Sequence, residues 1–496
     1  MQPTNELTPI APAAPAAAQT LEFAGSSVCA VIEDALAITT CTHIIGAITD
    51  SFEAAATGYP PSYRDNDRAV VDDPSLARAL FRRLRAALPE HVVDRHGGSW
   101  RLVGLNERFR FCRYTGGQSF RVHRDGAHAA EPETRSILTL QIYLDEDFDG
   151  GHTRFYGSRR GPIVGSIEAR TGRAIVFDHD LWHDGEAVTR GTKHVLRTDV
   201  IYARERAPVD EPREGVVALE GHTGYVFSLL AMRDRTLVSG SRDRTIRRWA
   251  REGDAWRCTH VLQGHAASVL ALVEPRQGVV WSGSRDRSIR EWNLEDGTSR
   301  VVATFGGAVL CLEPIGEGMI AAGTGDAKIA IVGERRALTG HRGWVWSLAS
   351  VGGGLLASAS EDGTIRLWHV ASGECIGATS PGRGPVHALA VLDDGSLAAG
   401  FADGHVVVYA VDRDRGSLGA IAVHAVHDGE IYALCSLPES RFATAGEDDH
   451  ANVHRADGAR AASILHRGFV RSLARLDSGT IATGSYDGLV RVWRPS

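Results

Sequence analysis

Two histidines and one aspartate in the first half of the chain have the types and spacing of a metal site. His123 and Asp125 stand two residues apart at the end of a segment with strand character (SFRVHRD), and His183 follows in FDHDLWHDG. Residues two apart in a strand project from the same face, so His123 and Asp125 are expected to grip one ion together. With His183 from a distant strand they make two imidazoles and one carboxylate, a set typical of non-haem iron(II).

Two other histidines lie near this motif and are rivals for the metal. His152 and His179 lie between Asp125 and His183 in the sequence. His179 occupies the position of a residue at the surface end of a strand, so we do not expect it to be a ligand. The remaining alternative is that His123, Asp125 and His183 are ordinary polar residues with satisfied hydrogen bonds.

The segments around the three residues strengthen the metal interpretation. RFRFCRY precedes the pair, LTLQIYLDEDFDGGHTRF lies between the ligands, and HDGEAVTRGTKHVLRTDVIY follows. Across roughly residues 100–203 the chain resembles the prolyl 4-hydroxylase-like branch of the 2-oxoglutarate-dependent oxygenases. The resemblance implies that His123, Asp125 and His183 bind Fe(II).

The same resemblance assigns a binding site for 2-oxoglutarate. A lysine ten residues after the last histidine pairs with the far carboxylate of 2-oxoglutarate in that family, and an upstream tyrosine supports it; the matching residues are Lys193 and Tyr114. Arg197 follows Lys193 by four on the same predicted strand face and could share or take over the contact. A guanidinium grips a carboxylate with two hydrogen bonds and an ammonium acts as a point charge, and the sequence leaves that choice open.

The resemblance also implies the chemistry. The cofactor Fe(II), the cosubstrate 2-oxoglutarate and O2 would hydroxylate a C–H bond and release succinate and carbon dioxide, with ascorbate as reductant. No catalytic residue beyond the metal site is implied.

The elements that must position these residues are many strands and a few helices. Helices are expected over roughly residues 42–57 and from Asp73-Pro74 onward, where Asp suits the N-cap and Pro the first turn. In the second helix Leu76, Leu80, Leu84 and Leu88 recur every four residues and form an apolar face. Short strands follow from about residue 107, so we expect a mainly β protein whose domain over 21–203 (core 100–203) is a double-stranded β-helix (jelly roll) with flanking helices.

Length and composition limit the number of domains, the kinds of partner and the location of the protein. The 496 residues are too many for one core, and the net charge of −7 gives no footprint for nucleic acid. The seven cysteines are dispersed without a CxxC pair, which indicates reduced thiols and a cytoplasmic location. No apolar run is long enough to span a membrane, residues 1–20 read as a flexible Ala/Pro-rich tail, and residues 204–214 (RERAPVDEPRE) read as a linker.

The chain repeats itself from residue 215 to residue 496. Seven segments align, and the aspartate of each turn recurs every 36 to 45 residues at Asp243, Asp286, Asp326, Asp362, Asp403, Asp448 and Asp487. An early Gly-His and an Asp turn before a closing Trp, at a period near 40, resemble the WD-repeat family. The resemblance predicts a seven-bladed β-propeller.

In that family a His, a Ser on the next strand, the turn Asp and the closing Trp form a buried hydrogen-bonded network. The expected sets are His222, Ser228, Asp243 and Trp249; His341, Ser347, Asp362 and Trp368; and His466, Ser472, Asp487 and Trp493. We interpret these residues as structural, because a buried carboxylate needs such partners. The third and fifth repeats lack the His and Ser and should be less rigid.

The ends of the repeat region predict how the ring closes and what it binds. The last repeat has three strands, and GVVALEGH before the first Gly-His supplies a spare strand that would complete it. Such rings usually bind a protein or peptide on one face. Loop residues Arg242, Arg244, Arg285 and Arg287 could meet acidic partners, although solvated surface is at least as good an interpretation of each of them alone.

Three functions remain compatible with the sequence. The first is a hydroxylase whose propeller recruits a protein substrate, with a prolyl residue as a candidate acceptor. The second is a small-molecule hydroxylase whose propeller controls location or oligomerisation. The third is a propeller scaffold with a degenerate oxygenase, which the intact triad and basic residue argue against. The acceptor, the partner and the oligomeric state are not determined by the sequence.

Overall fold

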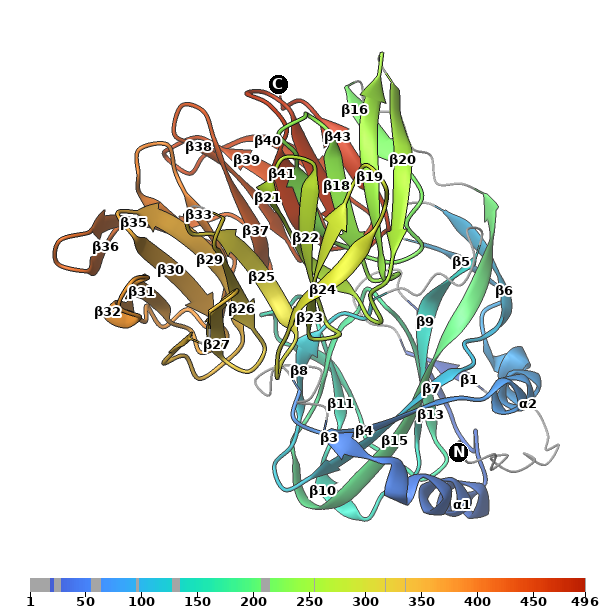
Figure 1. Cartoon of the computed structure of the whole chain (residues 1–496). Coiled ribbons are helices and arrows are strands. Elements are labelled where there is room, and N and C mark those ends of the chain that lie inside the picture. Colours follow the sequence, from blue (N-terminus) through green and yellow to red (C-terminus); the bar gives the residue numbers. More distant parts are fainter. Residues whose placement is uncertain are drawn as a thin grey trace. The chain divides into compact units, whose positions relative to one another are not determined.

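The computed structural model describes residues 18–21, 28–54, 64–94, 98–126, 134–206, 215–253, 255–316, 318–334 and 336–495. The chain divides into two compact units, Met1–Glu211 and Pro212–Ser496 (Figure 1). Of the predicted tail, Ala18–Thr20 forms strand β1 and residues 1–17 lie outside the described residues. Of the predicted linker, 204–206 still belong to strand β15, and 207–214 are not among the described residues.

The first unit contains an eleven-stranded sheet and a four-stranded sheet. The main path of the larger sheet is β1, β2 (Cys29–Ile32), β13 (Ala174–Asp178), β9 (Thr134–Tyr143), β15 (Val188–Arg206), β7 (Arg108–Thr115), β4 (Asp67–Asp72) and β3 (Glu53–Ala54). β10 (Phe148–Gly150) and β6 (Ser99–Leu105) pair with β15, and β5 (His91–Val93) pairs with β6. The smaller sheet runs β12 (Ile163–Ile167), β11 (Thr153–Tyr156), β14 (Trp182–Gly185) and β8 (Phe120–His123). The two sheets agree with the predicted jelly roll.

Two helices flank this unit. α2 (Pro74–Leu84) starts as predicted, since the Asp73 carboxylate accepts hydrogen bonds from the backbone N–H groups of Ser75 and Leu76. It continues into the 3-10 turn η3 (Arg85–Ala87), and the four predicted leucines are all buried.

The first helix differs from its prediction. α1 spans Ile38–Ile48 and is followed by the 3-10 turn η1 (Thr49–Ser51). The helix therefore starts four residues before the predicted start at residue 42, and it ends well before the predicted end at residue 57. Glu53 and Ala54 pair instead with β4, so sheet pairing overrides local helix propensity there. Residues 55–57 of the prediction lie outside the described residues. In the described part of the chain no helix is both long and apolar enough to cross a membrane.

Alternation along the strands gives the larger sheet two apolar faces. In β7, Phe109 and Phe111 belong to a cluster with the helix residues Leu76 and Leu80. Cys112 and Tyr114 of the same strand belong to a second cluster with Phe120 and Phe155 of the smaller sheet. The larger sheet is thus covered by helices on one face and by the smaller sheet on the other, and the second face holds the polar site described below.

The second unit consists of seven four-stranded antiparallel sheets, which confirms the predicted seven blades. The first three blades are β17 (Val226–Ala231), β18 (Leu237–Ser241), β19 (Thr245–Glu252), β20 (Ala255–Gln263); β21 (Val269–Arg276), β22 (Val279–Ser284), β23 (Ser288–Asn293), β24 (Ser299–Thr304); and β25 (Val309–Pro314), β26 (Ile320–Thr324), β27 (Lys328–Ile331), β28 (Ala337–Thr339). The fourth and fifth are β29 (Val345–Gly352), β30 (Leu355–Ser360), β31 (Ile365–His369), β32 (Glu374–Thr379); and β33 (Val386–Val391), β34 (Leu397–Phe401), β35 (His405–Asp412), β36 (Ser417–Ala425). The sixth is β37 (Ile431–Leu437), β38 (Arg441–Gly446), β39 (His450–His454) and β40 (Arg460–Leu465).

The seventh blade closes the ring as predicted. β41 (Val470–Arg475), β42 (Ile481–Ser485) and β43 (Val490–Trp493) are completed by β16 (Val216–Leu219), which pairs Val216 with Trp493 and Leu219 with Val490. The first blade packs against this one closely enough that a Cβ on Gly484 would lie 2.6 Å from Val226 Cγ1. Only a residue without a side chain fits there.

The hydrogen-bonded network of the first blade uses a different serine from the one predicted. His222 Nδ1 lies 2.8 Å from Asp243 Oδ2, His222 Nε2 lies 2.7 Å from Ser239 Oγ, and Trp249 Nε1 donates to Ser239 Oγ at 2.8 Å. Ser239 is on β18, next to β19, which carries Trp249, whereas Ser228 is on β17 and its hydroxyl makes no hydrogen bond in the described chain. The prediction of Ser228 was therefore wrong.

The fourth blade repeats this correction. His341 contacts Asp362 at 3.0 Å and Ser358 at 2.7 Å, and Trp368 donates to Ser358 at 2.7 Å. The predicted Ser347 instead accepts from the backbone N–H of Leu389 in the next blade.

The third predicted network is incomplete. Arg491 Nη1 lies 2.8 Å from His466 Nδ1 and donates to Asp487 Oδ2 at 2.7 Å, so a guanidinium separates the two predicted partners. In the described part of the chain, Ser472 Oγ and Trp493 Nε1 make no hydrogen bond. The Arg491 guanidinium replaces the direct contact between His466 and Asp487, because the arginine side chain reaches both of them from β43.

Two networks were missed by the sequence prediction. The second blade joins His265 to Asp286 and Ser282, and Trp292 donates to that serine. The sixth blade joins His427 to Asp448 and Thr444, with His454 in place of the closing Trp. The lower rigidity of the third and fifth blades stays a prediction.

Candidate metal centre

His123 and His183 face each other from neighbouring strands of the smaller sheet. β8 and β14 are antiparallel, and their register places the two histidines directly opposite each other. Both side chains point into the space between the sheets and are only 3% and 4% exposed. The centroids of the two rings lie 4.2 Å apart. Sheet pairing thus brings together two imidazoles that are sixty residues apart in the sequence.

Asp125 joins them from a loop. β8 ends at His123, and the backbone N–H of Asp125 donates to the carbonyl of His179 at 3.0 Å. We expected His123 and Asp125 to face the same way because both would lie in one strand. That reason was wrong, because Asp125 lies in the loop after β8. Asp125 Oδ1 still lies 3.5 Å from His123 Nε2, and Oδ2 lies 3.7 Å from His183 Nε2. One donor atom from each of the three residues falls within 4.8 Å of the others.

The orientation of each imidazole is set by the backbone. His123 Nδ1 lies 2.7 Å from the carbonyl oxygen of Arg121, and His183 Nδ1 lies 2.9 Å from that of Leu181. A carbonyl oxygen only accepts, so each Nδ1 carries the proton and each Nε2 presents a lone pair. Burial lowers the pKa of both histidines, that of His183 to about 3, so both rings are neutral at ordinary pH. Neutral imidazoles with free Nε2 lone pairs are the form that binds metals.

The charge of Asp125 is compensated inside the protein. Burial alone would raise the pKa of this carboxyl group, but the charge of the Arg197 guanidinium outweighs burial and holds the pKa well below its usual range. Arg197 Nη2 forms an ion pair with Asp125 Oδ1, and the Thr139 hydroxyl donates to Oδ2 at 2.6 Å. The structure thus places Arg197, predicted as a possible contact of 2-oxoglutarate, on the carboxylate of the metal site.

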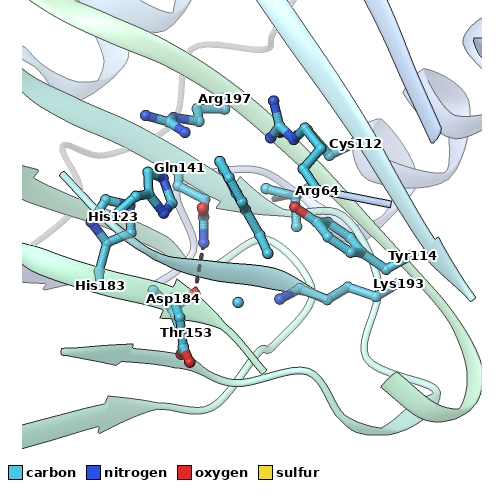
Figure 2. A pocket seen from close by; sticks show the side chains of 13 residues that line it. Arg64, Cys112, Tyr114, His123, Gln141, Thr153, His183, Asp184, Lys193 and Arg197 are labelled. Atoms are coloured by element: carbon cyan, nitrogen blue, oxygen red, sulfur yellow. Dashed lines mark hydrogen bonds between the residues drawn. The ribbon is translucent and has the colours of Figure 1, made fainter. Parts of the chain in front are cut away.

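Lys193 and Tyr114 line a pocket beside the three residues (Figure 2). They lie opposite each other on β15 and β7, and the Lys193 ammonium is 5.5 Å from the centre of the Tyr114 ring and 5.3 Å from that of Tyr143. Lys193 is 3% exposed, and its ammonium donates one hydrogen bond to the carbonyl of Gly151. Burial lowers its pKa to about 8. Two N–H donors of this ammonium remain for a ligand.

Arg64 is a pocket residue that the sequence analysis missed. Its guanidinium stacks 4.0 Å from the centre of the Phe120 ring and hydrogen-bonds the Tyr114 side chain, and Figure 2 shows it next to Tyr114. Arg64 reaches the pocket through an isolated bridge to Phe120, fifty-six residues away in the sequence. No local pattern around PSYRDND marks such a long-range contact.

The sequence analysis also missed a group of hydrogen-bonded polar residues at the pocket. Gln141 Nε2 and the Tyr143 hydroxyl both donate to Thr153 Oγ1, at 2.9 and 2.6 Å. Thr139, Gln141 and Tyr143 stand at alternate positions of β9, with Leu140 and Ile142 between them. That alternation was the signal available in LTLQIY, since every second residue of a strand faces the same way.

Neither rival histidine joins the three ligand candidates. His152 Nδ1 pairs with Glu186 at 2.6 Å, and its side chain is 39% exposed. His179 is 5% exposed, so its prediction as a surface residue was wrong. Its Nε2 lies 4.0 Å from Asp199 Oδ1. Backbone hydrogen bonding to Asp125 draws His179 inward from the end of its strand.

The donor set fits a divalent metal ion. Two neutral imidazoles and one ionised carboxylate are the ligands that non-haem iron(II) takes on one face. The backbone carbonyls that fix both rings are the outer contacts that orient metal-bound histidines. Lys193, Tyr114 and Arg64 provide a cationic region beside the metal position that can receive a carboxylate.

Comparison with known proteins agrees with both units. Residues 109–198 match the family model of the 2OG-Fe(II) oxygenase superfamily. Residues 214–250, 256–293, 333–369 and 463–494 match that of the WD domain, G-beta repeat. The crystal structure of the WD40 β-propeller domain of Doa1 superposes with a TM-score of 0.51 at 25% identity, covering 57% of this chain and 98% of that chain.

Curated relatives are similar over shorter stretches. A probable cytosolic Fe-S cluster assembly factor from Schizosaccharomyces pombe is 28% identical over 142 residues, 23% of this chain and 23% of its own length. A probable cytosolic iron-sulfur protein assembly protein from Vanderwaltozyma polyspora is 29% identical over 137 residues, 23% of this chain and 39% of its own. The chain thus spans well under half the length of these relatives. By its family matches, the chain joins a domain of the 2OG-Fe(II) oxygenase superfamily to a WD-repeat β-propeller.

Proposed function

We propose that this protein hydroxylates a residue of a protein or peptide that its propeller recruits, with proline as the first candidate acceptor. The observation that carries the proposal is the buried set of His123, Asp125 and His183 next to the Lys193 ammonium. The oxygenase family implies Fe(II), 2-oxoglutarate and O2. Iron bound by the three residues would couple conversion of 2-oxoglutarate and O2 into succinate and carbon dioxide to insertion of the second oxygen atom into a C–H bond.

The residues of this chain have separate tasks in that reaction. The carbonyls of Arg121 and Leu181 hold the two imidazoles in the metal-binding tautomer. Arg197 balances the charge of Asp125, which favours Lys193 over Arg197 as the partner of the far carboxylate. Tyr114 and Arg64 adjoin Lys193 in the pocket.

Two finer points belong to the proposal. The sequence resemblance, rather than the family match, suggests a prolyl acceptor and ascorbate as the reductant that keeps iron ferrous. WD-repeat domains generally mediate protein interactions, which supports a role of the second unit in recruitment. Tethering a docking module to a catalytic unit raises the local concentration of substrate without a new catalytic contact.

The direct test is succinate formation by the full-length protein with Fe(II), 2-oxoglutarate and ascorbate, followed by NMR. We expect slow turnover without acceptor, faster turnover with an accepted substrate, and none in His123→Ala. His152→Ala is the matched control, since His152 lies near the motif but pairs with Glu186. Turnover by His123→Ala equal to that of the wild type would remove the oxygenase assignment.

Recruitment is tested by comparing full-length protein with residues 1–211 on proline-containing peptides, whole lysate and small molecules. Residues 1–211 form one compact unit and include the whole of β15. We expect equal activity without acceptor and an advantage of the full-length chain on protein acceptors. Equal activity on every acceptor would favour the small-molecule hydroxylase.

A further inference from the structure

The ring of Phe120 separates a metal-ligand candidate from Arg64. The centroids of the Phe120 and His123 rings lie 3.7 Å apart, and the central carbon of the Arg64 guanidinium lies 4.0 Å from the centre of the same phenyl ring. Two groups so close to one ring centre occupy opposite faces of the ring. Arg64 therefore lies one phenyl ring away from an imidazole that would hold the metal.

The Arg64 guanidinium contacts three other residues of the pocket. It stacks on Phe120, it donates a hydrogen bond to the side chain of Tyr114, and its Nη2 lies 3.9 Å from Cys112 Sγ. Arg64 is 6% exposed and reaches the pocket through its bridge to Phe120. The guanidinium is therefore part of the pocket wall rather than a surface group.

Arg64, Tyr114 and Lys193 gather on one side of the pocket, which we call its basic end. Figure 2 shows these three side chains on that side and His123 and His183 on the other. The Lys193 ammonium lies 5.5 Å from the centre of the Tyr114 ring, and the side chain of the same tyrosine is hydrogen-bonded to Arg64. An anion that contacts Lys193 in this pocket therefore comes close to Arg64 as well.

The shape of 2-oxoglutarate matches this division of the pocket. Its keto acid end carries the oxygen atoms that a metal ion held by His123 and His183 would bind. Two methylene groups separate that end from the far carboxylate, and the Phe120 ring separates His123 from Arg64. An apolar ring beside the methylene groups and cations beyond it suit the two parts of the molecule.

Arg64 has two properties that Lys193 lacks. Burial lowers the pKa of Lys193 to about 8, so this ammonium loses part of its charge in mildly alkaline solution. A guanidinium stays protonated in that range, and its planar fork of N–H groups matches the two oxygens of a carboxylate. Its five N–H donors let one guanidinium serve the Tyr114 side chain and a carboxylate together.

We infer that Arg64 contacts the far carboxylate of 2-oxoglutarate together with Lys193, and that this pair makes the pocket selective for 2-oxo acids with a second carboxylate. A 2-oxo acid that ends in a methyl group places an apolar carbon against two cations and therefore binds weakly. The inference rests on the 2-oxoglutarate-dependent reaction proposed above. It adds a residue from outside the strands that carry Lys193 and Tyr114.

The test is an anaerobic calorimetric titration of the full-length protein loaded with Fe(II), which measures binding without turnover. The ligands are 2-oxoglutarate and 2-oxopentanoate, which has the same keto acid end and carbon chain but a methyl group in place of the far carboxylate. We expect the wild type to bind 2-oxoglutarate about 1000-fold more tightly than 2-oxopentanoate, because two charge-assisted contacts are lost with the carboxylate.

Variants of Arg64 identify its contribution. Arg64→Met keeps the length of the side chain without its charge, and it should raise the Kd for 2-oxoglutarate about 30-fold and that for 2-oxopentanoate less than about threefold. Arg64→Lys keeps the charge without the planar fork and should raise the Kd for 2-oxoglutarate about fivefold. Arg113→Met is the matched control and should change neither Kd, because Arg113 also stacks on a phenylalanine ring, that of Phe52, but forms its ion pair with Asp67.

A double-mutant cycle separates direct contact from support of Tyr114. If Arg64 acted only by orienting the Tyr114 hydroxyl, Arg64→Met would have no effect in the Tyr114→Phe background. We expect Arg64→Met to raise the Kd for 2-oxoglutarate at least about tenfold in that background. Circular dichroism reports whether each variant folds, and Arg64→Lys keeps the test valid if Arg64→Met does not fold.

Equal weakening of both ligands in Arg64→Met would show a purely structural role and overturn the inference. An unchanged Kd for 2-oxoglutarate in Arg64→Met, or loss of the effect in the Tyr114→Phe background, would overturn it as well. Failure of the wild type to bind Fe(II) or 2-oxoglutarate would contradict the oxygenase proposal and remove the inference with it. Wild-type binding that Arg64→Met leaves intact would contradict the inference alone.

Discussion

His123 in the first unit and His222 in the second are both buried histidines beside an aspartate, but their ring nitrogens have different partners. His222 uses Nδ1 for Asp243 and Nε2 for Ser239, so both nitrogens are engaged by hydrogen bonds. His123 uses Nδ1 for a backbone carbonyl and directs Nε2 at a carboxylate 3.5 Å away. A second imidazole, that of His183, shares the same space.

The difference teaches how identical residue types separate into structural and metal-binding roles. In the blade, Asp243 and Ser239 engage both ring nitrogens of His222 and Trp249 completes the network, which leaves no ring nitrogen of His222 for an ion. In the metal centre, three acceptors converge on one point, an arrangement that a cation stabilises.

The largest expected effect is loss of metal. His123→Ala and Asp125→Ala should each abolish Fe(II) binding in an anaerobic titration and leave the fold intact by circular dichroism, because each removes one of the three ligand atoms that the described residues bring together. His222→Ala should keep wild-type affinity for iron, since its imidazole is fully hydrogen-bonded. Full iron binding by both His123→Ala and Asp125→Ala, or its loss in His222→Ala, would break the comparison.

Removal of the pocket ammonium comes next. Lys193→Ala should raise the apparent KM for 2-oxoglutarate about 10- to 100-fold, since a hydrogen bond to a charged group is lost, and should leave the affinity for Fe(II) unchanged. Lys328→Ala, an exposed lysine in the propeller paired with Asp326, is the control. A larger rise in Arg197→Ala than in Lys193→Ala would transfer the carboxylate contact to Arg197, and no effect from either would mean that the contact lies elsewhere.

The pH dependence of binding follows from the same residue. Burial lowers the pKa of Lys193 to about 8, so its charged fraction falls as pH rises through 8. The Kd for 2-oxoglutarate should therefore be constant below that pH and rise by up to about tenfold per unit above it. Isothermal titration calorimetry between pH 6.5 and 9.5 measures the slope. Lys193→Ala should bind weakly with a flat profile in this range; a slope retained in that variant would exclude Lys193 as its source.

The smallest effect distinguishes two serines of the first blade. Ser239→Ala leaves His222 and Trp249 each without a partner and should lower the free energy of local opening by about 1–2 kcal/mol. Ser228→Ala removes a buried hydroxyl that makes no hydrogen bond in the described chain and should change it by less than about 0.5 kcal/mol. Hydrogen exchange of peptides from β17 to β19 measures both. Equal effects of Ser239→Ala and Ser228→Ala would show that Ser228 belongs to the network after all.

Residue types and periodicity determined much of this protein. The recurrence of turn aspartates predicted seven blades, and the spare strand at residue 216 predicted how the ring closes. Asp73 and the leucines four residues apart predicted α2, because capping and amphipathicity are local properties. His123, Asp125 and His183 were candidates because few residue types bind metals and they stood in a familiar context.

Only the tertiary structure decided which groups meet. Ser239 rather than Ser228 completes the first network, Arg491 separates His466 from Asp487, and Arg64 reaches Tyr114 from a distant segment. Each of these contacts depends on the register between strands, and a shift of one residue sends a side chain to the opposite face of the sheet. Arg197 likewise lies on the expected strand, but its guanidinium forms an ion pair with Asp125. Asp125 is a loop residue, and a backbone hydrogen bond to His179 sets its position. The sequence thus determined the repeat pattern and the residue types available for chemistry. Long-range strand pairing determined which side chains become hydrogen-bond and ion-pair partners, because these contacts join residues that are far apart in the sequence.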